Sequence, residues 1–138
     1  MKSMVRVIIS AVMLLLVSGC TMFSDSKYNN AKYKDGYFIV VLNEKFDDVY
    51  DATLQAIERG QTRDANDNAY NIKVNKKVKN KAVIGAISSL EPSDFVEVIM
   101  IKTSENKTRV TVKYGRQGDK DMSSALINII KANIHQPK

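Results

Sequence analysis

Residues 95–114 read FVEVIMIKTSENKTRVTVKY, the strongest structural signal in the chain. Both ends of this stretch are rich in β-branched residues, and Ser104-Glu105-Asn106-Lys107 between them has the composition of a hairpin turn. In the second arm Val110, Val112 and Tyr114 alternate with polar residues, so one face of that strand is expected to be buried and the other wet. We therefore expect an antiparallel sheet.

Three further strands are expected before this hairpin. Residues 37–42 form an unbroken β-favouring run, as in a strand with little solvent exposure. Across residues 70–79 apolar side chains alternate with polar ones, which predicts a strand with one buried face. The residues expected on that buried face are Tyr70, Ile72, Val74 and Val78. Residues 82–87 predict another strand, in which Gly85 marks either a bulge or a close backbone approach.

Two amphipathic helices complete the pattern. The first follows Asn43, whose side chain can cap it, and ends at Gly60. The second follows Gly118, with Asp119 as its cap. Each helix has one apolar stripe to bury, so the favoured fold is α+β with two layers. We expect an antiparallel sheet of about five strands, in the order strand, helix, four strands, helix, with both helices on one face.

The chain begins with a short basic segment, containing Lys2 and Arg6, followed by an apolar run over residues 7–17. This run has the length of an export signal and is too short to cross about 30 Å of hydrocarbon as a helix. It ends in Val17-Ser18-Gly19-Cys20, which resembles the lipobox of bacterial lipoproteins. The resemblance implies that Val17, Ser18 and Gly19 are recognised by a signal peptidase that cleaves before Cys20. It also implies that Cys20 carries a diacylglycerol on its thiol and an acyl chain on its amino group.

These signals divide the chain into a signal peptide (1–19), a lipidated cysteine with a tether (20–36) and one globular domain (37–138). The tether is polar and is expected to be mobile or ordered only near its end. Alternatively, Tyr28 and Tyr33 dock on the domain or rest at the membrane interface. The net charge of +6 falls to +4 without Lys2 and Arg6, which leaves 19 basic and 15 acidic residues. The only cysteine is the proposed lipid site, so no disulfide framework is expected.

Three short motifs accompany the lipobox: Gly36-Tyr37-Phe38, Val49-Tyr50-Asp51-Ala52 and the segment VKYGRQGD at residues 112–119. Together they resemble a domain-of-unknown-function family of small bacterial lipoproteins, over nearly all of residues 36–134. Within it, the closest resemblance is to a virulence-associated membrane lipoprotein of an intracellular Gram-negative pathogen. The resemblance implies envelope residence and a contribution to virulence, and it supplies no catalytic residue. In a Gram-negative host, Thr21 after the cysteine implies the outer membrane.

The residues give little support to catalysis or metal binding. His135 is the only histidine and lies three residues from the end of the sequence, so we expect neither a His-based triad nor a two-histidine metal site within one chain. Asp47, Asp48 and Asp51 offer at most weak cation binding, and a solvated helix N-terminus is the favoured interpretation. We expect no catalytic residue, no metal and no cofactor apart from the lipid on Cys20.

A basic run lies near the middle of the chain and consists of Lys73, Lys76, Lys77, Lys79 and Lys81. It is a candidate contact for anionic phospholipid or lipopolysaccharide, since each lysine near such a surface is worth about 1 kcal/mol. The alternative is a solvated strand face whose lysines deter edge-to-edge pairing. A nucleic-acid partner is not expected, because such sites interleave the lysines with exposed aromatic residues and because the chain is exported.

Two functions follow from these expectations. One is a non-catalytic envelope lipoprotein that binds an envelope or host partner. The alternative is a carrier of a lipid or small apolar ligand in a cavity between the sheet and its helices. An enzyme is the least supported class.

Overall fold

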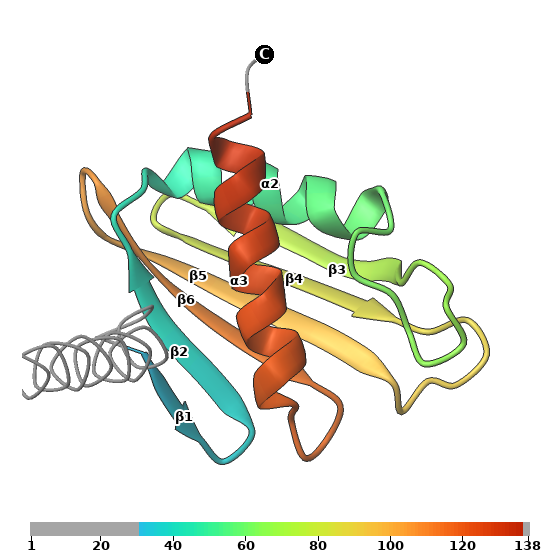
Figure 1. The fold of residues 1–138 in the computed structure, drawn as a ribbon. Coiled ribbons are helices and arrows are strands. Elements are labelled where there is room, and N and C mark those ends of the chain that lie inside the picture. The colour runs from blue at the N-terminus through green and yellow to red at the C-terminus, as the bar shows by residue number, and fades with distance from the viewer. Residues whose placement is uncertain (1–30, 137–138) are drawn as a thin grey trace, which may run out of the picture. The chain divides into compact units, whose positions relative to one another are not determined.

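A computed structural model describes residues 31–136 of the chain (Figure 1). Within this range the elements are β1 (Lys32–Lys34), β2 (Tyr37–Leu42), α2 (Phe46–Glu58), β3 (Asn71–Val78), β4 (Lys81–Ile87), β5 (Phe95–Ser104), β6 (Lys107–Tyr114) and α3 (Lys120–Ile134). The strands form one antiparallel sheet in the order β1-β2-β6-β5-β4-β3. The predicted α+β two-layer fold is confirmed, with six strands instead of about five.

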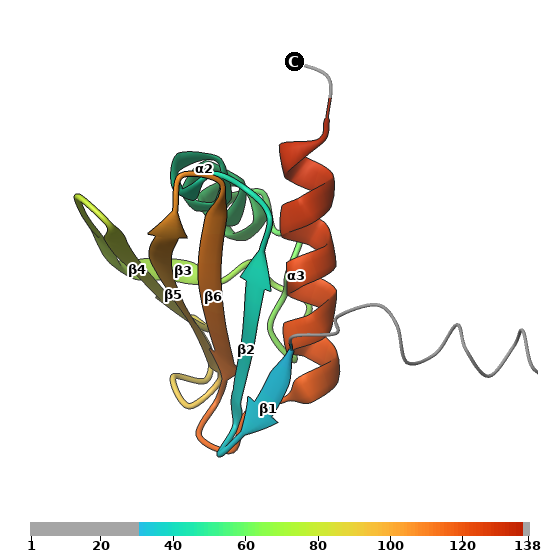
Figure 2. The ribbon, with the colours of Figure 1, turned by 90° about the vertical axis from the view of Figure 1, so that its left-hand side faces the viewer.

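Both helices cover the same face of the sheet, and Figures 1 and 2 show α2 and α3 together on that side. The strand residues that face them are buried, as Phe38, Val40 and Leu42 are in β2. Their neighbours on the other face are only half-buried, which is the alternation expected of a sheet with one covered side. The helix-facing layer is completed by Ala82, Ile84, Val96, Val98, Met100, Val110 and Val112 on the strands and by Val49, Ile57, Leu126, Ile127 and Ile130 on the helices.

The additional strand, β1, lies in the segment that was expected to be a tether. It pairs with β2 through the turn Asp35-Gly36, and both turn residues have positive φ angles, 53° and 86°. Asp-Gly with two positive φ angles is the chemistry of a tight two-residue hairpin. Tyr33 on β1 places its hydroxyl 3.5 Å from the carbonyl oxygen of Gln117. The described end of the predicted tether, residues 31–36, is thus part of the folded domain, and the alternative in which Tyr33 docks on the domain is correct for this residue. Tyr28 lies outside the described residues.

The predicted burial of β3 is wrong beyond Ile72. The register of β3 against β4 shifts between Ile72 and Val74, so a bulge interrupts the alternation. As a result Val74 and Val78 turn away from the helices and are 39% and 66% exposed. Asn75 pairs with the buried Ile84, which puts Asn75 on the helix-covered face instead. The bulge is in β3, while Gly85 is the residue that pairs with Val74.

The two helix starts differ in their caps. Asp119 caps α3 as predicted, because its carboxylate accepts from the backbone N–H of Met122 at 2.9 Å. The prediction that Asn43 caps α2 is wrong: the N-cap is Lys45, and no side-chain hydrogen bond is made there. The end of α2 agrees with the sequence, since Gly60 has a φ of 66° just beyond the C-cap Arg59.

Candidate functional site

The predicted lipid-attachment segment, Val17, Ser18, Gly19 and Cys20, lies outside the described residues, so it stays a prediction. The described domain begins at Ala31, eleven residues after Cys20. A chain of that length spans at most about 40 Å. Within residues 31–136, no helix is long and apolar enough to cross a bilayer.

The structure separates the five lysines of the predicted basic run. Lys76 and Lys81 lie on the sheet face away from the helices, paired with Val83 and Ile101 respectively. Lys77 lies on the opposite, helix-covered face, because it pairs with the buried Ala82. Lys73 is the extra residue of the bulge, and Lys79 is in the turn that joins β3 to β4.

Lys77 connects β3 to α2. Its Nζ atom lies 3.0 Å from Asp47 Oδ1 and 4.6 Å from the centre of the Tyr50 ring. The hydrogen bond that Lys77 donates to the Asp47 carboxylate is the largest cause of a raised Lys77 pKa. Next to it, the Tyr50 hydroxyl donates to Asn75 Oδ1 at 2.6 Å. Lys77 and Asn75 were expected on the solvent-facing side of the strand; they lie on the side of α2 and contact it, and both stay exposed.

Asp47 is therefore paired with a lysine, and Asp47, Asp48 and Asp51 are all exposed. In residues 31–136 no group of three or more His, Cys, Asp or Glu side chains could hold a metal ion.

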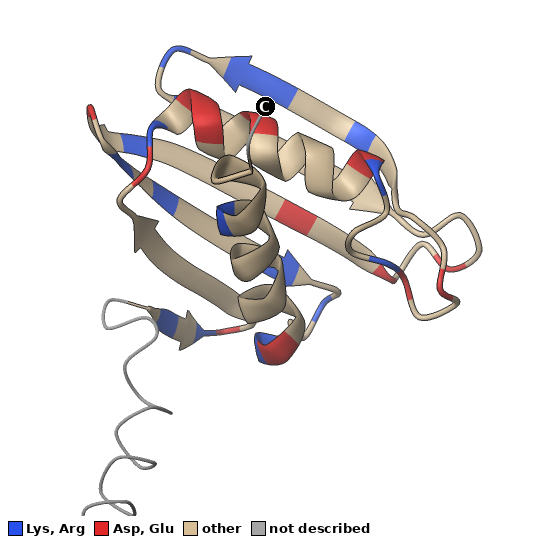
Figure 3. Cartoon of the chain, turned by 45° about the horizontal axis from the view of Figure 1, so that its top comes forward, with Lys and Arg blue, Asp and Glu red and all other residues tan. Residues whose placement is uncertain are grey.

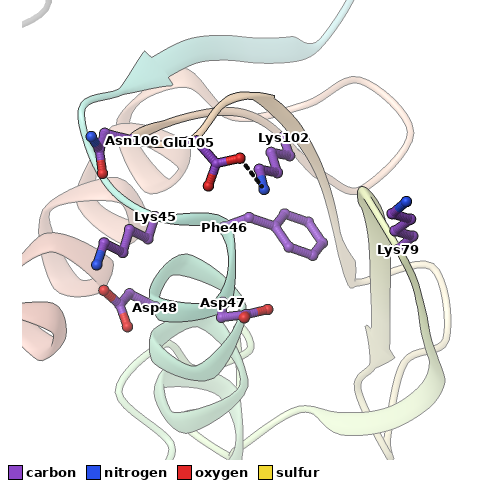
Figure 4. Close-up of a pocket in the computed structure, with 8 residues that line it drawn as sticks. All are labelled: Lys45, Phe46, Asp47, Asp48, Lys79, Lys102, Glu105 and Asn106. Atoms are coloured by element: carbon purple, nitrogen blue, oxygen red, sulfur yellow. Dashed lines mark ion pairs between the residues drawn. The ribbon is translucent and has the colours of Figure 1, made fainter.

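A pocket of about 450 Å³ lies where the start of α2 meets two hairpin turns (Figure 4). Its lining combines three basic and three acidic side chains with Phe46 and Asn106: Lys45, Lys79, Lys102, Asp47, Asp48 and Glu105. Lys102 and Glu105 pair at 3.2 Å. The equal numbers of positive and negative groups suit a small neutral or zwitterionic polar group better than an ion of either sign.

At the other end of the sheet, a polar cluster is built around two aspartates. Asp64 accepts hydrogen bonds from Ser88 Oγ at 2.6 Å and from the amides of Asn66 and Asn68. The bond from Ser88 is the largest cause of a lowered Asp64 pKa. Asp94 accepts from the Tyr70 hydroxyl at 2.7 Å and from the amide of Ala65 at 2.8 Å. These bonds hold the loop after α2 against the turn between β4 and β5.

Two tyrosines belong to the same end of the domain. Burial is the largest cause of a raised Tyr70 pKa, and the hydrogen bond to Asp94 adds to it. Burial also raises the pKa of Tyr114 to about 12, and its hydroxyl lies 2.7 Å from Thr62 Oγ1. The hydrogen bonds of these two tyrosines and of Asp64 connect the loop after α2 with strand β6 and with the turn between β4 and β5, so they brace this end of the domain.

The histidine is also part of a structural link. His135 at the end of α3 has its Nε2 atom 2.8 Å from Glu44 Oε1, in the loop before α2. Nearby, the Asn133 amide donates to Ala52 O at 3.2 Å and to Gln61 Oε1 at 2.8 Å. His135 thus helps to fix α3 against the segment that includes α2.

The sheet face away from α2 and α3, here called the open face, gathers basic residues that are far apart in the sequence. Apart from Lys107 beside the β5–β6 turn, the strand registers place six on it: Lys32 and Lys34 from β1, Lys76 from β3, Lys81 from β4, and Arg109 and Lys113 from β6. Glu97, opposite Lys113, is the only acidic residue in the six described strands. Sequence reasoning identified Lys76 and Lys81 as a candidate contact and missed the other four. The outward alternation of Arg109 and Lys113 was the signal available for two of them.

Nearly all of the described domain lies within the part of the chain that matches a known sequence family. Residues 2–133 match the family described as "Protein of unknown function (DUF3568)". The chain belongs to this family. No curated protein matches the chain. The DUF3568 match confirms the expectation of a domain-of-unknown-function family, and it assigns no activity, ligand or partner.

Proposed function

We propose that this DUF3568 protein is a lipid-anchored lipoprotein of the bacterial envelope. The observation that carries the proposal is Val17-Ser18-Gly19-Cys20, placed after an apolar run and a basic start, with Cys20 as the only cysteine. Its residue types fit the chemistry: small residues enter the protease site, and a thiolate is the nucleophile that forms the thioether. Two or three acyl chains then hold the protein durably, since each buried methylene contributes about 0.8 kcal/mol.

The proposed role of the domain is non-catalytic binding of an envelope or host partner, with a contribution to virulence. In support, the polar groups at the end of the sheet form hydrogen bonds with one another, which ties them to a structural role. The sheet also presents one face that neither helix covers (Figure 2). Thr21 after Cys20 favours the outer membrane if the host is Gram-negative.

The carrier alternative lacks a comparable observation. The two pockets that the structure describes are lined mainly by charged and polar residues and lie at the hairpin turns. The apolar residues between the sheet and the helices, such as Ile84, Leu126 and Ile130, are fully buried. Partner binding is therefore the function we propose first.

The proposal is tested by replacing the lipid-accepting residue. Wild-type protein expressed in a Gram-negative bacterium is expected to partition into the detergent-rich phase, and Cys20→Ser to remain an unlipidated precursor outside it. Met22→Ser serves as the control, because it changes a nearby apolar residue and leaves the lipobox intact. Equal partitioning of wild type and Cys20→Ser would overturn the anchor. Crosslinking of the wild type in intact cells then identifies protein neighbours, whereas co-purified lipid would favour the carrier.

A further inference from the structure

The open face combines basic side chains with apolar ones. Six basic side chains and one carboxylate lie on it, together with half-buried apolar residues such as Ile39, Val83 and Ile99. Val74 and Val78, turned outward by the bulge, extend this apolar area to the edge of the sheet. An apolar area framed by charged residues marks an interaction surface.

On the other side of the domain, helix α2 carries charge of the opposite sign. Helix α2 carries Asp47, Asp48, Asp51 and Glu58 and no basic residue. Figure 3 shows acidic segments on α2 and basic segments along the strands. A negatively charged surface would therefore attract the domain with its open face forward and α2 pointing away.

The charge and the apolar area indicate which partner would bind the open face. A second copy of the chain would place six cations against six cations in a face-to-face contact, and like charges across an interface are unfavourable. A bilayer with anionic phospholipids supplies the complementary charge, and its interface also accepts apolar side chains. The short chain between Cys20 and Ala31 would keep a bilayer within about 40 Å of the domain.

We infer that the open face docks on the surface of an anionic phospholipid bilayer. This inference rests on the proposed function for the source of the nearby membrane, and the docking itself depends on Lys32, Lys34, Lys76, Lys81, Arg109 and Lys113. Docking of this face leaves α2 and α3 directed away from the lipid, accessible to a partner.

The test uses the full chain with Cys20→Ser, so that no covalent lipid contributes. Its binding is measured by co-sedimentation with vesicles of phosphatidylcholine and phosphatidylglycerol, and with vesicles of phosphatidylcholine alone. The open-face variant adds Lys76→Gln, Lys81→Gln and Arg109→Gln. The control variant instead adds Lys45→Gln, Arg59→Gln and Lys120→Gln, three exposed cations outside the open face. Both have the same net charge, and residues 1–30 are identical in all chains.

The expected result is binding to the anionic vesicles that weakens in high salt. Each cation near the surface contributes about a fivefold factor, so the open-face variant should bind on the order of a hundredfold more weakly. The control variant should bind nearly as well as the parent chain. Equal loss in the two variants, or equal binding to neutral vesicles, would overturn the inference. The molecular mass of each chain in solution is also measured without vesicles. A mass that changes only in the open-face variant would overturn the inference in favour of a second copy as the partner of this face.

The anchor and the docking face can fail separately. Loss of vesicle selectivity with intact detergent partitioning of the wild type would reject the docking face and leave the anchor. Selective vesicle binding without lipidation of the wild type would reject the anchor and leave the docking face.

Discussion

Gly118 and Gly36 meet backbone to backbone where the β1–β2 turn passes the start of α3. Both have positive φ angles, 78° and 86°. A Cβ atom built on Gly118 would overlap the carbonyl group of Gly36, and one built on Gly36 would lie 2.7 Å from Gln117 O. These two glycines therefore let an edge hairpin and a helix start approach more closely than any side chain would permit.

The first prediction separates this contact from the effect of φ alone. Gly118→Ala is expected to destabilise the protein more than Gly115→Ala. Gly115 also has a positive φ, 66°, but its added Cβ would meet only Ser93 O at 3.6 Å. Asp119→Ala should cost about 1 kcal/mol through loss of the cap. Urea unfolding of the three variants measures these effects, and equal stability of Gly118→Ala and Gly115→Ala would contradict the close contact.

The second prediction concerns Tyr114, which is only 5% exposed. Its pKa in the folded state is about 12, above the ordinary value of 10.0, so folding favours the protonated phenol. The contribution of the protonated Tyr114 phenol to the free energy of unfolding is fully present below about pH 10 and is lost as the pH rises through about 12. A shift of two units corresponds to about 3 kcal/mol.

Tyr114→Phe removes that titrating group and leaves Thr62 without its partner, at a cost of about 1 to 3 kcal/mol near neutral pH. The stability difference between wild type and Tyr114→Phe should then shrink between about pH 10 and pH 12. A difference that stays constant over this range would show that Tyr114 does not titrate as described.

At the scale of elements, the bulge in β3 reverses the faces of the strand. It turns Val78 outward and brings Asn75 and Lys77 to α2. The third prediction is that Val78→Ala changes the free energy of unfolding by less than about 0.5 kcal/mol. Val98→Ala, at a fully buried position, should cost about 2 kcal/mol. Similar losses in thermal or urea unfolding would mean that β3 alternates without a bulge.

Comparison of these elements shows what the sequence could reveal. The hairpin of β5 and β6, the strand β2, both helices and the Asp119 cap follow from local patterns, because alternation and capping act over a few residues. The bulge could not be predicted, because its position depends on how β3 pairs with β4. The hairpin of β1 had a signal in Asp35-Gly36, but three exposed residues are too short a strand for periodicity to detect.

The candidate site residues also divide into those that a local motif predicts and those that only the strand order brings together. The lipobox is a local motif, so the sequence alone supports the proposed anchor. The open face gathers residues from four strands, from Lys32 to Lys113, and only the strand order brings them together. The linear basic run included Lys77 among the candidate contact residues, but Lys77 lies on the helix-covered face and pairs with Asp47.

The molecule as a whole combines the proposed anchor at Cys20 with a small domain whose described part begins eleven residues later. The domain is basic on its open face and acidic along α2, so a charged surface would orient it. Both the proposed binding of an envelope partner and the proposed orientation at a membrane depend on the anchor. Both therefore depend on covalent lipid at Cys20.

The most direct test is the intact mass of the wild-type protein extracted from bacterial membranes with detergent. The account predicts a chain that begins at Cys20, with added mass equal to a diacylglyceryl group and an N-linked acyl chain. Fragmentation should place both additions on Cys20. A chain that retains residues 1–19, one cleaved at a different bond, or one that begins at Cys20 without acyl mass would contradict the account.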